Sequence, residues 1–190
     1  HFYLNCLKEL YGLAQLKAFK EIQDMIILLS KHLRYIFSWN SEMVPLKEEL
    51  RMCENYVQLQ AVGRRDGSRC LLDISPELLE FLVPPVSILT LTENCVKHGA
   101  RLDHPLEVKV KGKILPCGDG RLADIVISDN GPGFPADILE KLNKGKGPDP
   151  ERDHVGLWNL IQRFQILYGS RFAVNFWNDR GAYVEIIIEV

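Results

Sequence analysis

The sequence predicts an α+β protein in which a helical hairpin precedes a layer of helices packed on one face of a mixed, mostly antiparallel sheet. Three observations predict this fold class. Apolar residues recur every three or four positions before residue 60, a charged joint with two glycines follows at 63–69, and strand-like runs alternate with helical ones thereafter. We therefore expect a helical region over residues 1–66 and an α/β layer over residues 67–190.

Apolar stripes mark the helices of the first region. One stripe runs from Phe19 to Ile36, a second runs from Leu46 to Val57, and a shorter helix is expected from Phe2 to about Leu16. The stretch 38–45 predicts a turn, so the two longer helices should form an antiparallel hairpin. Two helices cannot hide both stripes from water. Pairing with a second copy into a four-helix bundle would do so, and packing on the rest of the chain is the alternative.

Strands and helices mix beyond residue 69. Strands are expected at Cys70–Ile74, Leu106–Leu115, Leu122–Asp129, Phe172–Trp177 and Ala182–Val190, and helices at Val86–His98, Ile138–Asn143 and Leu157–Tyr168. The last strand alternates apolar residues with acidic ones, which is typical of a sheet with one covered face. The turn Asn178–Gly181 joins the last two strands as a hairpin.

Charge and cysteine usage exclude several classes of function. With 23 Lys and Arg against 25 Asp and Glu, the net charge of -2 provides no broad basic surface for a nucleic acid. No apolar stretch approaches the roughly 20 residues that cross a bilayer. The five cysteines form no Cys-x-x-Cys pair, which argues against a zinc site or a disulfide framework and favours a reducing cytosol. Because the sequence opens on His1 without a secretory pattern, we expect it to be part of a longer polypeptide.

The helix expected over Val86–His98 has two unlike faces. Ile88, Leu91 and Cys95 should face the core. The polar residues that share the other stripe, and can line one pocket, are Thr90, Asn94, Lys97 and His98.

That polar stripe suits a metal-bound triphosphate. The side-chain oxygen of Asn94 is a hard neutral ligand for Mg²⁺, and Lys97 supplies a compact positive charge for phosphate oxygens. The alternative is an ordinary helix end, with a surface ion pair and a histidine favoured by the helix dipole.

Asp129 ends a strand and begins a turn that contains two glycines. It has the same parity as Ile125, so its carboxylate should lie on the packed side of the sheet. A buried carboxylate needs a donor, and the exocyclic amino group of adenine is one. Gly131 and Gly133 let the backbone approach a ring closely. A simple turn at the end of a strand is the alternative.

Residues 144–153 are charged and poor in apolar side chains, and they lead into Gly156 and Leu157 at the start of a helix. Amides at a helix N-terminus bind phosphate, and a glycine there admits close approach. We expect this segment to act as a lid over the helix start. A surface loop without such a role is the alternative.

Taken together, these three elements resemble the ATP-binding domain of the histidine-kinase and gyrase-type (GHKL) superfamily. The resemblance implies a GHKL-type α/β sandwich over residues 67–190, with ATP and Mg²⁺ as cofactors and Asn94 as the metal ligand. The residues that would bind the nucleotide are Asn94, Lys97 and His98, similar to the Asn box; Asp129, Gly131 and Gly133, similar to the first Gly box; and Gly156 and Leu157, similar to a shortened second Gly box.

The segments His1–Asn5 and Tyr56–Gln60 are similar to sensor histidine kinases of the LytS and YesM type, which carry a Pro-His-Phe-x-x-Asn phosphoacceptor box. This resemblance implies that His1 accepts the phosphoryl group, that Asn5 orients its imidazole, and that Lys97 balances phosphate charge. Residues 1–66 would then be a dimerisation and histidine phosphotransfer region. An accidental histidine at the start of the sequence is the alternative reading of His1.

The implied function is a homodimeric two-component sensor kinase core, which phosphorylates itself and passes the phosphoryl group to the receiver domain of a response regulator. It would be the cytoplasmic portion of a bacterial sensor, anchored to a membrane only through segments absent from this chain. Two other readings are a non-catalytic ATP-binding dimeric module and an ATPase of the same superfamily.

Two departures from the superfamily pattern bear on these readings. Phe2 occupies the position at which many histidine kinases place an acid, so no general base is assigned. Thr90 occupies the position of the glutamate that activates water in the ATPases, and Glu93 lies about 100° round the helix from Asn94. Weak water activation disfavours the ATPase reading.

Overall fold

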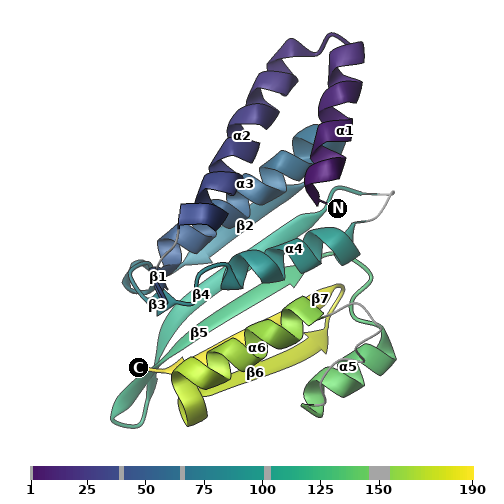
Figure 1. Ribbon diagram of the computed structural model, residues 1–190. Helices are drawn as coiled ribbons and strands as arrows, with labels where there is room; N and C mark the ends of the chain where they lie inside the picture. Colours follow the sequence, from purple (N-terminus) through teal and green to yellow (C-terminus); the bar gives the residue numbers. More distant parts are fainter. Residues whose placement is uncertain (1, 39–40, 65–66, 101–103, 146–154) are drawn as a thin grey trace.

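Three helices precede an α/β layer in the computed structural model, which describes residues 2–38, 41–64, 67–100, 104–145 and 155–190 (Figure 1). The helices of the first region are α1 (Phe2–Gln15), α2 (Phe19–Ser38) and α3 (Leu46–Arg64). Those of the layer are α4 (Ser87–Gly99), α5 (Ala136–Asn143) and α6 (Val155–Tyr168), with short 3₁₀ turns at Pro76–Leu78 and Gly169–Arg171. The helices predicted from apolar periodicity are all present, and the expected α+β fold class is confirmed.

The main sheet has five strands in the order β2-β4-β5-β7-β6. The strands are β2 (Arg69–Ile74), β4 (Glu107–Cys117), β5 (Gly120–Asp129), β6 (Phe172–Asn178) and β7 (Ala182–Glu189). Only the β2–β4 pair of this sheet is parallel, so the sheet is mixed and mostly antiparallel as expected. A second sheet, which the sequence did not reveal, pairs β1 (Val44–Pro45) with β3 (Leu82–Val83) next to the start of α3.

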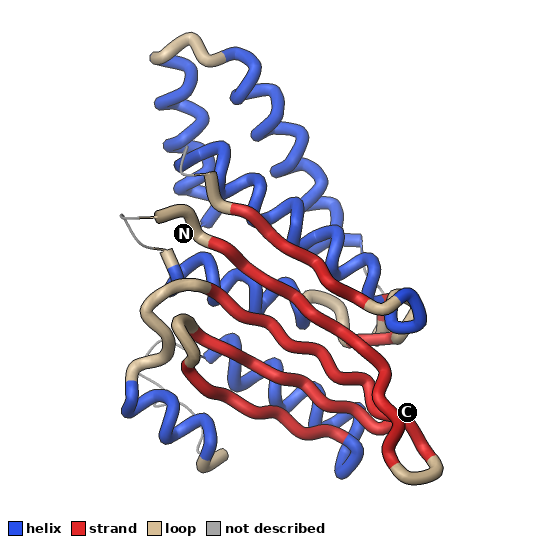
Figure 2. The backbone as a smooth tube through the Cα atoms, turned by 180° about the vertical axis from the view of Figure 1, so that it is seen from behind, coloured by secondary structure: helices blue, strands red, loops and turns tan. Residues whose placement is uncertain are grey.

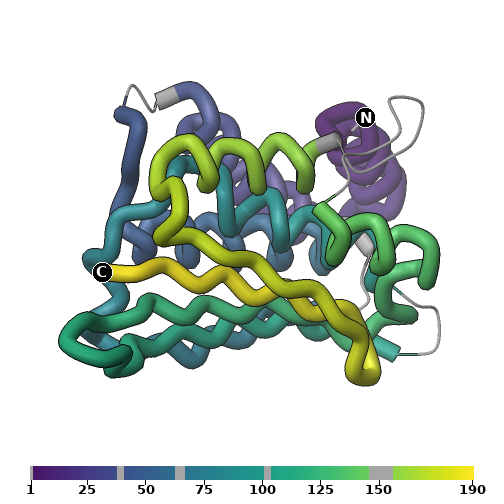
Figure 3. The backbone as a smooth tube through the Cα atoms, turned by 90° about the horizontal axis from the view of Figure 1, so that it is seen from below, coloured from purple at the N-terminus to yellow at the C-terminus, as the bar shows by residue number. Residues whose placement is uncertain are grey.

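Helices cover one face of the sheet and leave the other open. Figure 3 shows α4 and α6 on the same side of the strands, and Figure 2 shows the opposite face without a covering helix. The covered face is formed by alternate residues such as Val110, Ile125 and Ile186, which are fully buried. Alternation in the strands therefore positions α4 directly above the centre of the sheet.

Helix α3 contributes to the same core as the sheet. Its residues Leu46, Leu50 and Cys53 are buried and belong to one apolar cluster with Ile88 and Leu91 of α4. Helix α3 packs on α2 on one side and on α4 and β2 on the other, so it contacts both of the predicted regions. The division of the chain at residue 66 therefore stays a prediction.

Helices α1 and α2 keep a large apolar surface exposed. Leu4, Leu7 and Tyr11 of α1 lie on one stripe and are each more than half exposed, as is Phe37 of α2. Within the described residues, no helix combines the length and the apolar character needed to span a membrane.

His32 of α2 is buried among aromatic rings where the three helices meet. Its ring centroid lies 5.1 Å from that of Phe2 and 5.5 Å from that of Tyr56, and the residue is 1% exposed. Its Nδ1 has no hydrogen-bond partner among the described residues. Burial lowers the pKa of His32 to about 4, because the charged imidazolium would lose its hydration there.

This burial predicts a pH-dependent stability. Between pH 6.5 and 4 the unfolded chain binds a proton on His32 that the folded chain does not, so the free energy of unfolding falls as pH falls through this window. The substitution His32→Leu removes this pH-dependent contribution to the free energy of unfolding. Chemical denaturation at pH 7.5 and 4.5 should show wild-type stability falling by about 2 to 3 kcal/mol more than that of the variant. An equal fall in both proteins would contradict the neutral buried imidazole.

Candidate functional site

A cavity of about 170 Å³ lies between α4, the end of β5 and the start of α6. Its walls are mainly apolar, with Leu91, Ile127 and Val184 among them. Residues predicted from the sequence that line it are Asn94, His98, Asp129, Gly133 and Leu157. The structure therefore brings together side chains from three separate stretches of the chain around one slot of the size and polarity that suit a flat heteroaromatic ring.

Asp129 places a carboxylate at the floor of this cavity. The residue is 7% exposed, and its Oδ1 accepts hydrogen bonds from the backbone N–H of Gly131 (2.8 Å) and of Ala182 (3.3 Å). The Cys95 thiol donates to the same carboxylate. Burial raises the pKa of Asp129, and these hydrogen bonds together with His98 act in the opposite direction. The inward direction expected from strand parity is observed.

The turn after Asp129 depends on close backbone approach. A Cβ on Gly131 would lie 2.4 Å from the Cα of Gly99 at the end of α4, so no larger residue fits there. Gly133 has φ of +81°, in the left-handed region that favours glycine, and a Cβ there would meet the Asn178 side chain at 2.8 Å. These two glycines let the turn lie against both α4 and β6.

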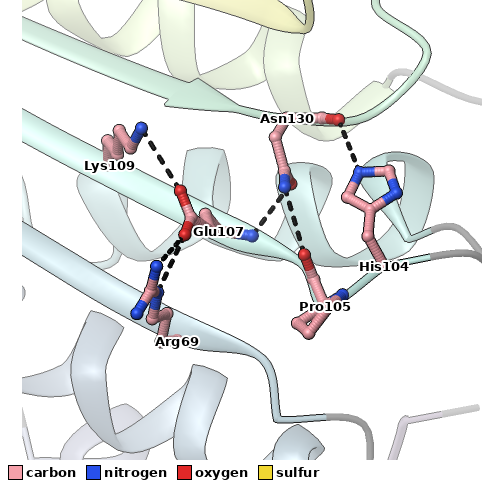
Figure 4. Close-up of polar contacts among 6 residues, drawn as sticks. All are labelled: Arg69, His104, Pro105, Glu107, Lys109 and Asn130. Atoms are coloured by element: carbon pink, nitrogen blue, oxygen red, sulfur yellow. Dashed lines mark hydrogen bonds and ion pairs between the residues drawn. The ribbon is translucent and has the colours of Figure 1, made fainter.

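Asn130 holds the same turn from the other side, and sequence reasoning assigned it no role (Figure 4). Its Oδ1 accepts from the backbone N–H of Glu107 (2.8 Å), and its Nδ2 donates to the carbonyl of Pro105 (3.1 Å). His104 Nε2 lies 3.2 Å from the Asn130 carbonyl oxygen. Glu107 is in turn paired with Arg69 of β2. Asn130 thereby fixes the Asp129 turn to the start of β4.

The polar stripe of α4 is only partly directed at the cavity. Asn94 and His98 line it, whereas Lys97 is exposed and is not among the lining residues. Leu91 and Cys95, which were expected only in the core, are buried and also line the cavity. The Nδ2 of Asn94 is buried without a hydrogen-bond partner among the described residues. A side-chain amide in this condition fits a polar ligand that enters the cavity.

The start of α6 contributes to two cavities. Leu157 is buried and lines the first, while Gly156 lines a neighbouring cavity of about 270 Å³ together with Thr90 and Arg163. Arg163 donates to the carbonyl of Pro85 (2.8 Å), which ties α6 to the start of α4. Most of the predicted lid, residues 146–153, lies outside the described residues.

The Thr90 hydroxyl and the Glu93 carboxyl group lie on α4 near Asn94, where a base could activate water. The Thr90 hydroxyl donates to the carbonyl of Val86 (2.6 Å), the N-cap residue of its own helix. Glu93 does not line the cavity, and burial, with a smaller contribution from the charge of Glu49, raises its pKa to about 7. Neither group is placed to activate water at this cavity.

Of the two residues predicted for the phosphoacceptor box, Asn5 belongs to α1. His1 lies outside the described residues, and Asn5 is exposed on the first turn of the helix. Phe2 packs on His32 and Tyr56. Tyr3 lies near α4: burial and then the charge of Glu93 raise its pKa. The beginning of α1 therefore lies close to the residue that precedes Asn94.

The donor set fits a metal that arrives with its substrate. Within the described residues there is no group of three or more His, Cys, Asp or Glu that could hold a metal by itself. Mg²⁺ commonly takes one or two protein oxygens and completes its shell with phosphate and water. The single amide of Asn94 beside the apolar slot is compatible with Mg²⁺ bound as a nucleotide complex.

Residues 1–67 match the family model described as histidine kinase. Along its full length the chain is 25% identical to the sensor histidine kinase YesM of Bacillus subtilis, and over 95% of its length it is 28% identical to the sensor protein kinase HptS of Staphylococcus aureus. A sensor-like histidine kinase of Staphylococcus epidermidis is 30% identical over 90% of the chain. The chain spans about a third of the length of these relatives, with 31%, 34% and 32% of each covered.

Solved structures of histidine kinases share the fold. The catalytic domain of ThkA superposes with a TM-score of 0.58 at 14% identity, covering 77% of this chain and 95% of that one. AdeS of Acinetobacter baumannii gives 0.51 at 14% identity, covering 94% and 80%. ShkA in complex with AMPPNP gives 0.51 at 17% identity, covering 95% and 38%. The chain is thus similar to sensor histidine kinases, at its N-terminus by the family match and along its whole length by the relatives, and the solved structures share its fold.

Proposed function

We propose that this chain is the core of a two-component sensor histidine kinase, which transfers the γ-phosphoryl group of ATP to His1 and then to an aspartate of a response-regulator receiver domain. One observation carries the proposal. A single cavity unites the amide of Asn94 with the buried carboxylate of Asp129 across an apolar slot, in a chain similar along its full length to YesM.

The adenine ring would occupy the apolar slot. Its exocyclic amino group would donate to Asp129, whose second oxygen is not the acceptor of the Gly131 and Ala182 amides. Leu91 and Ile127 would contact the faces of the ring, and Gly133 would admit it without a side chain in the way. ATP rather than a free phosphate is therefore the substrate that this cavity suits.

The triphosphate would extend along the polar stripe of α4 toward the start of α6. Asn94 would hold Mg²⁺, which would supply neutralising charge to the phosphates when bound. His98 lies in the cavity wall, and Lys97 lies on the last turn of the same helix, where it can reach phosphate oxygens from the solvent side. The amides of Gly156 and Leu157 at the helix start would donate to the phosphates.

Transfer would begin with the neutral imidazole of His1, the form of histidine that has a free electron pair on a ring nitrogen. A ring nitrogen without a proton attacks the γ-phosphorus, the bond to the β–γ bridging oxygen breaks, and ADP leaves. Asn5, one turn along α1, would orient the ring. The closeness of Tyr3 to Glu93 supports this reaction, because it brings the start of α1 toward the helix that carries Asn94.

The exposed apolar stripe of α1 and α2 supports a homodimer. Leu4, Leu7 and Tyr11 are 58 to 68% exposed, and a second copy that pairs two such hairpins into a four-helix bundle would bury them. As its relatives are named sensors, we place the chain on the cytoplasmic side of a membrane, with any anchor in segments outside these residues.

Phosphorylation can be tested directly with γ-labelled ATP and Mg²⁺ in the full-length protein. We expect protein-bound label that survives base and is lost in acid, as a phosphoramidate does, and we expect no label in His1→Ala. Release of free phosphate without protein label would indicate an ATPase. Nucleotide binding with neither label nor release would indicate a regulatory module. Either result would contradict the proposed kinase.

Two substitutions should separate recognition of adenine from recognition of the metal-bound phosphates. Asp129→Asn should weaken both adenosine and Mg²⁺-ATP by about tenfold or more, since it alters a hydrogen bond to a charged group. Asn94→Ala should weaken Mg²⁺-ATP by a similar factor and leave adenosine unchanged. Titration calorimetry measures both ligands, and exposed Asp137→Asn on α5 is the matched control. Normal affinities in both variants would refute the site assignment.

A further inference from the structure

The carboxylate of Glu49 joins three helices at a point that the proposed reaction does not use. Glu49 lies on α3 and is fully buried. Its Oε1 accepts a hydrogen bond from the Tyr35 hydroxyl of α2 and another from the backbone N–H of Val86 (2.6 Å). Its Oε2 accepts from the backbone N–H of Leu89 (3.0 Å) in the first turn of α4. One side chain thus contacts α2 and the start of α4 while belonging to α3.

Helix α4 lacks a cap of its own, which explains why a carboxylate is needed there. Val86 occupies the N-cap position with φ of +65° and makes no side-chain cap hydrogen bond. The first N–H groups of any helix have no partner within the helix, and leaving them buried and unpaired is costly. Glu49 pairs with two of these donors from another helix, and its negative charge is favourable at the positive end of the helix dipole.

The groups around Glu49 suit its charged form. All the partners described for it donate, and none accepts. Burial and the neighbouring carboxylate raise the pKa of Tyr35, so its hydroxyl keeps the proton that it donates. Burial raises the pKa of Glu49 itself, while these hydrogen bonds lower it. Without these three donors the Glu49 carboxylate would be buried and unpaired, which is costly. Its burial therefore depends on the start of α4 lying where the Val86 and Leu89 amides reach it.

The capped end of α4 is two turns from Asn94. Asn94 lies eight positions after the N-cap Val86, which corresponds to about 12 Å along the axis. We propose that Glu49 is a positioning residue for the nucleotide site: it fixes the start of α4 to the α2–α3 hairpin and thereby sets where Asn94 meets the metal-bound phosphates. This proposal rests on the proposed function and adds a residue, outside the cavity, on which that function depends.

Affinity for two ligands tests the proposal in this chain. Adenosine reports on Asp129 of β5, whereas Mg²⁺-ATP reports in addition on Asn94 of α4. In Glu49→Gln the amide group leaves at least one α4 donor unpaired, so we expect Mg²⁺-ATP affinity to fall about tenfold and adenosine affinity to stay within about twofold. Glu48→Gln, the neighbouring residue that pairs with exposed Arg51, is the matched control and should change neither.

Tyr35→Phe provides a second variant that keeps the carboxylate and removes one donor. It should lower Mg²⁺-ATP affinity by about threefold in the same selective manner, and it carries the test if Glu49→Gln does not fold.

The outcomes separate this proposal from the function on which it rests. If the unaltered chain does not bind Mg²⁺-ATP, both are wrong. If the unaltered chain binds and both variants keep full Mg²⁺-ATP affinity, only the role of Glu49 is wrong. Equal loss of adenosine and Mg²⁺-ATP would also overturn it, because that pattern reports a general loss of structure instead of a displaced Asn94.

Discussion

The position of α4 is the constraint on which the rest of the structure depends. This helix lies between α3 and the covered face of the sheet, and its buried residues include Ile88, Leu91 and Val96. Its two ends are fixed by different means. Glu49 binds the first turn, and Gly99 at the last turn lies against Gly131. Because most faces of α4 are buried, only a narrow stripe of the helix, which includes Asn94 and His98, lines the cavity.

That stripe explains how a small set of side chains would form the proposed nucleotide site. Asn94 and His98 line the same cavity as Asp129. The Asp129 carboxylate accepts a hydrogen bond from the Gly131 amide, and the Asn130 side chain binds the start of β4. On the side proposed to bind adenine, the cavity is thus held by hydrogen bonds of the Asp129 turn. On the side proposed to bind phosphate, it depends on the start of α6 and on the position of α4.

Under the proposed function, the placement of two polar groups near Asn94 favours transfer to histidine over hydrolysis. An ATPase of the superfamily needs a base one turn before its metal-binding Asn. In this chain that position is Thr90, whose hydroxyl donates to the Val86 carbonyl at the start of the same helix. Glu93 is excluded from the cavity wall, although its raised pKa would otherwise suit a base. Neither Thr90 nor Glu93 is placed to activate water in the cavity, which in the proposed reaction would preserve the phosphoryl group for a protein nucleophile.

Local patterns predicted the elements well and the cavity only in part. Strand parity correctly directed Asp129 inward, because a period of two leaves no choice of face. Helical spacing was less decisive, since residues 100° apart can share a wall: Leu91 and Cys95 line the cavity, and Lys97 does not. The contacts of Glu49 had no signal in the sequence, because two of its partners are backbone amides 37 and 40 residues away and the third is the Tyr35 hydroxyl on another helix.

The most direct measurement is a crystal structure of the chain with Mg²⁺ and a non-hydrolysable ATP analogue. The central claim predicts density for the adenine in the slot, its amino group at the Asp129 carboxylate, and the metal-bound phosphates between Asn94 and the start of α6. Analogue bound at any other surface, or a slot closed by the side chains of Leu91 and Ile127 under saturating analogue, would contradict it.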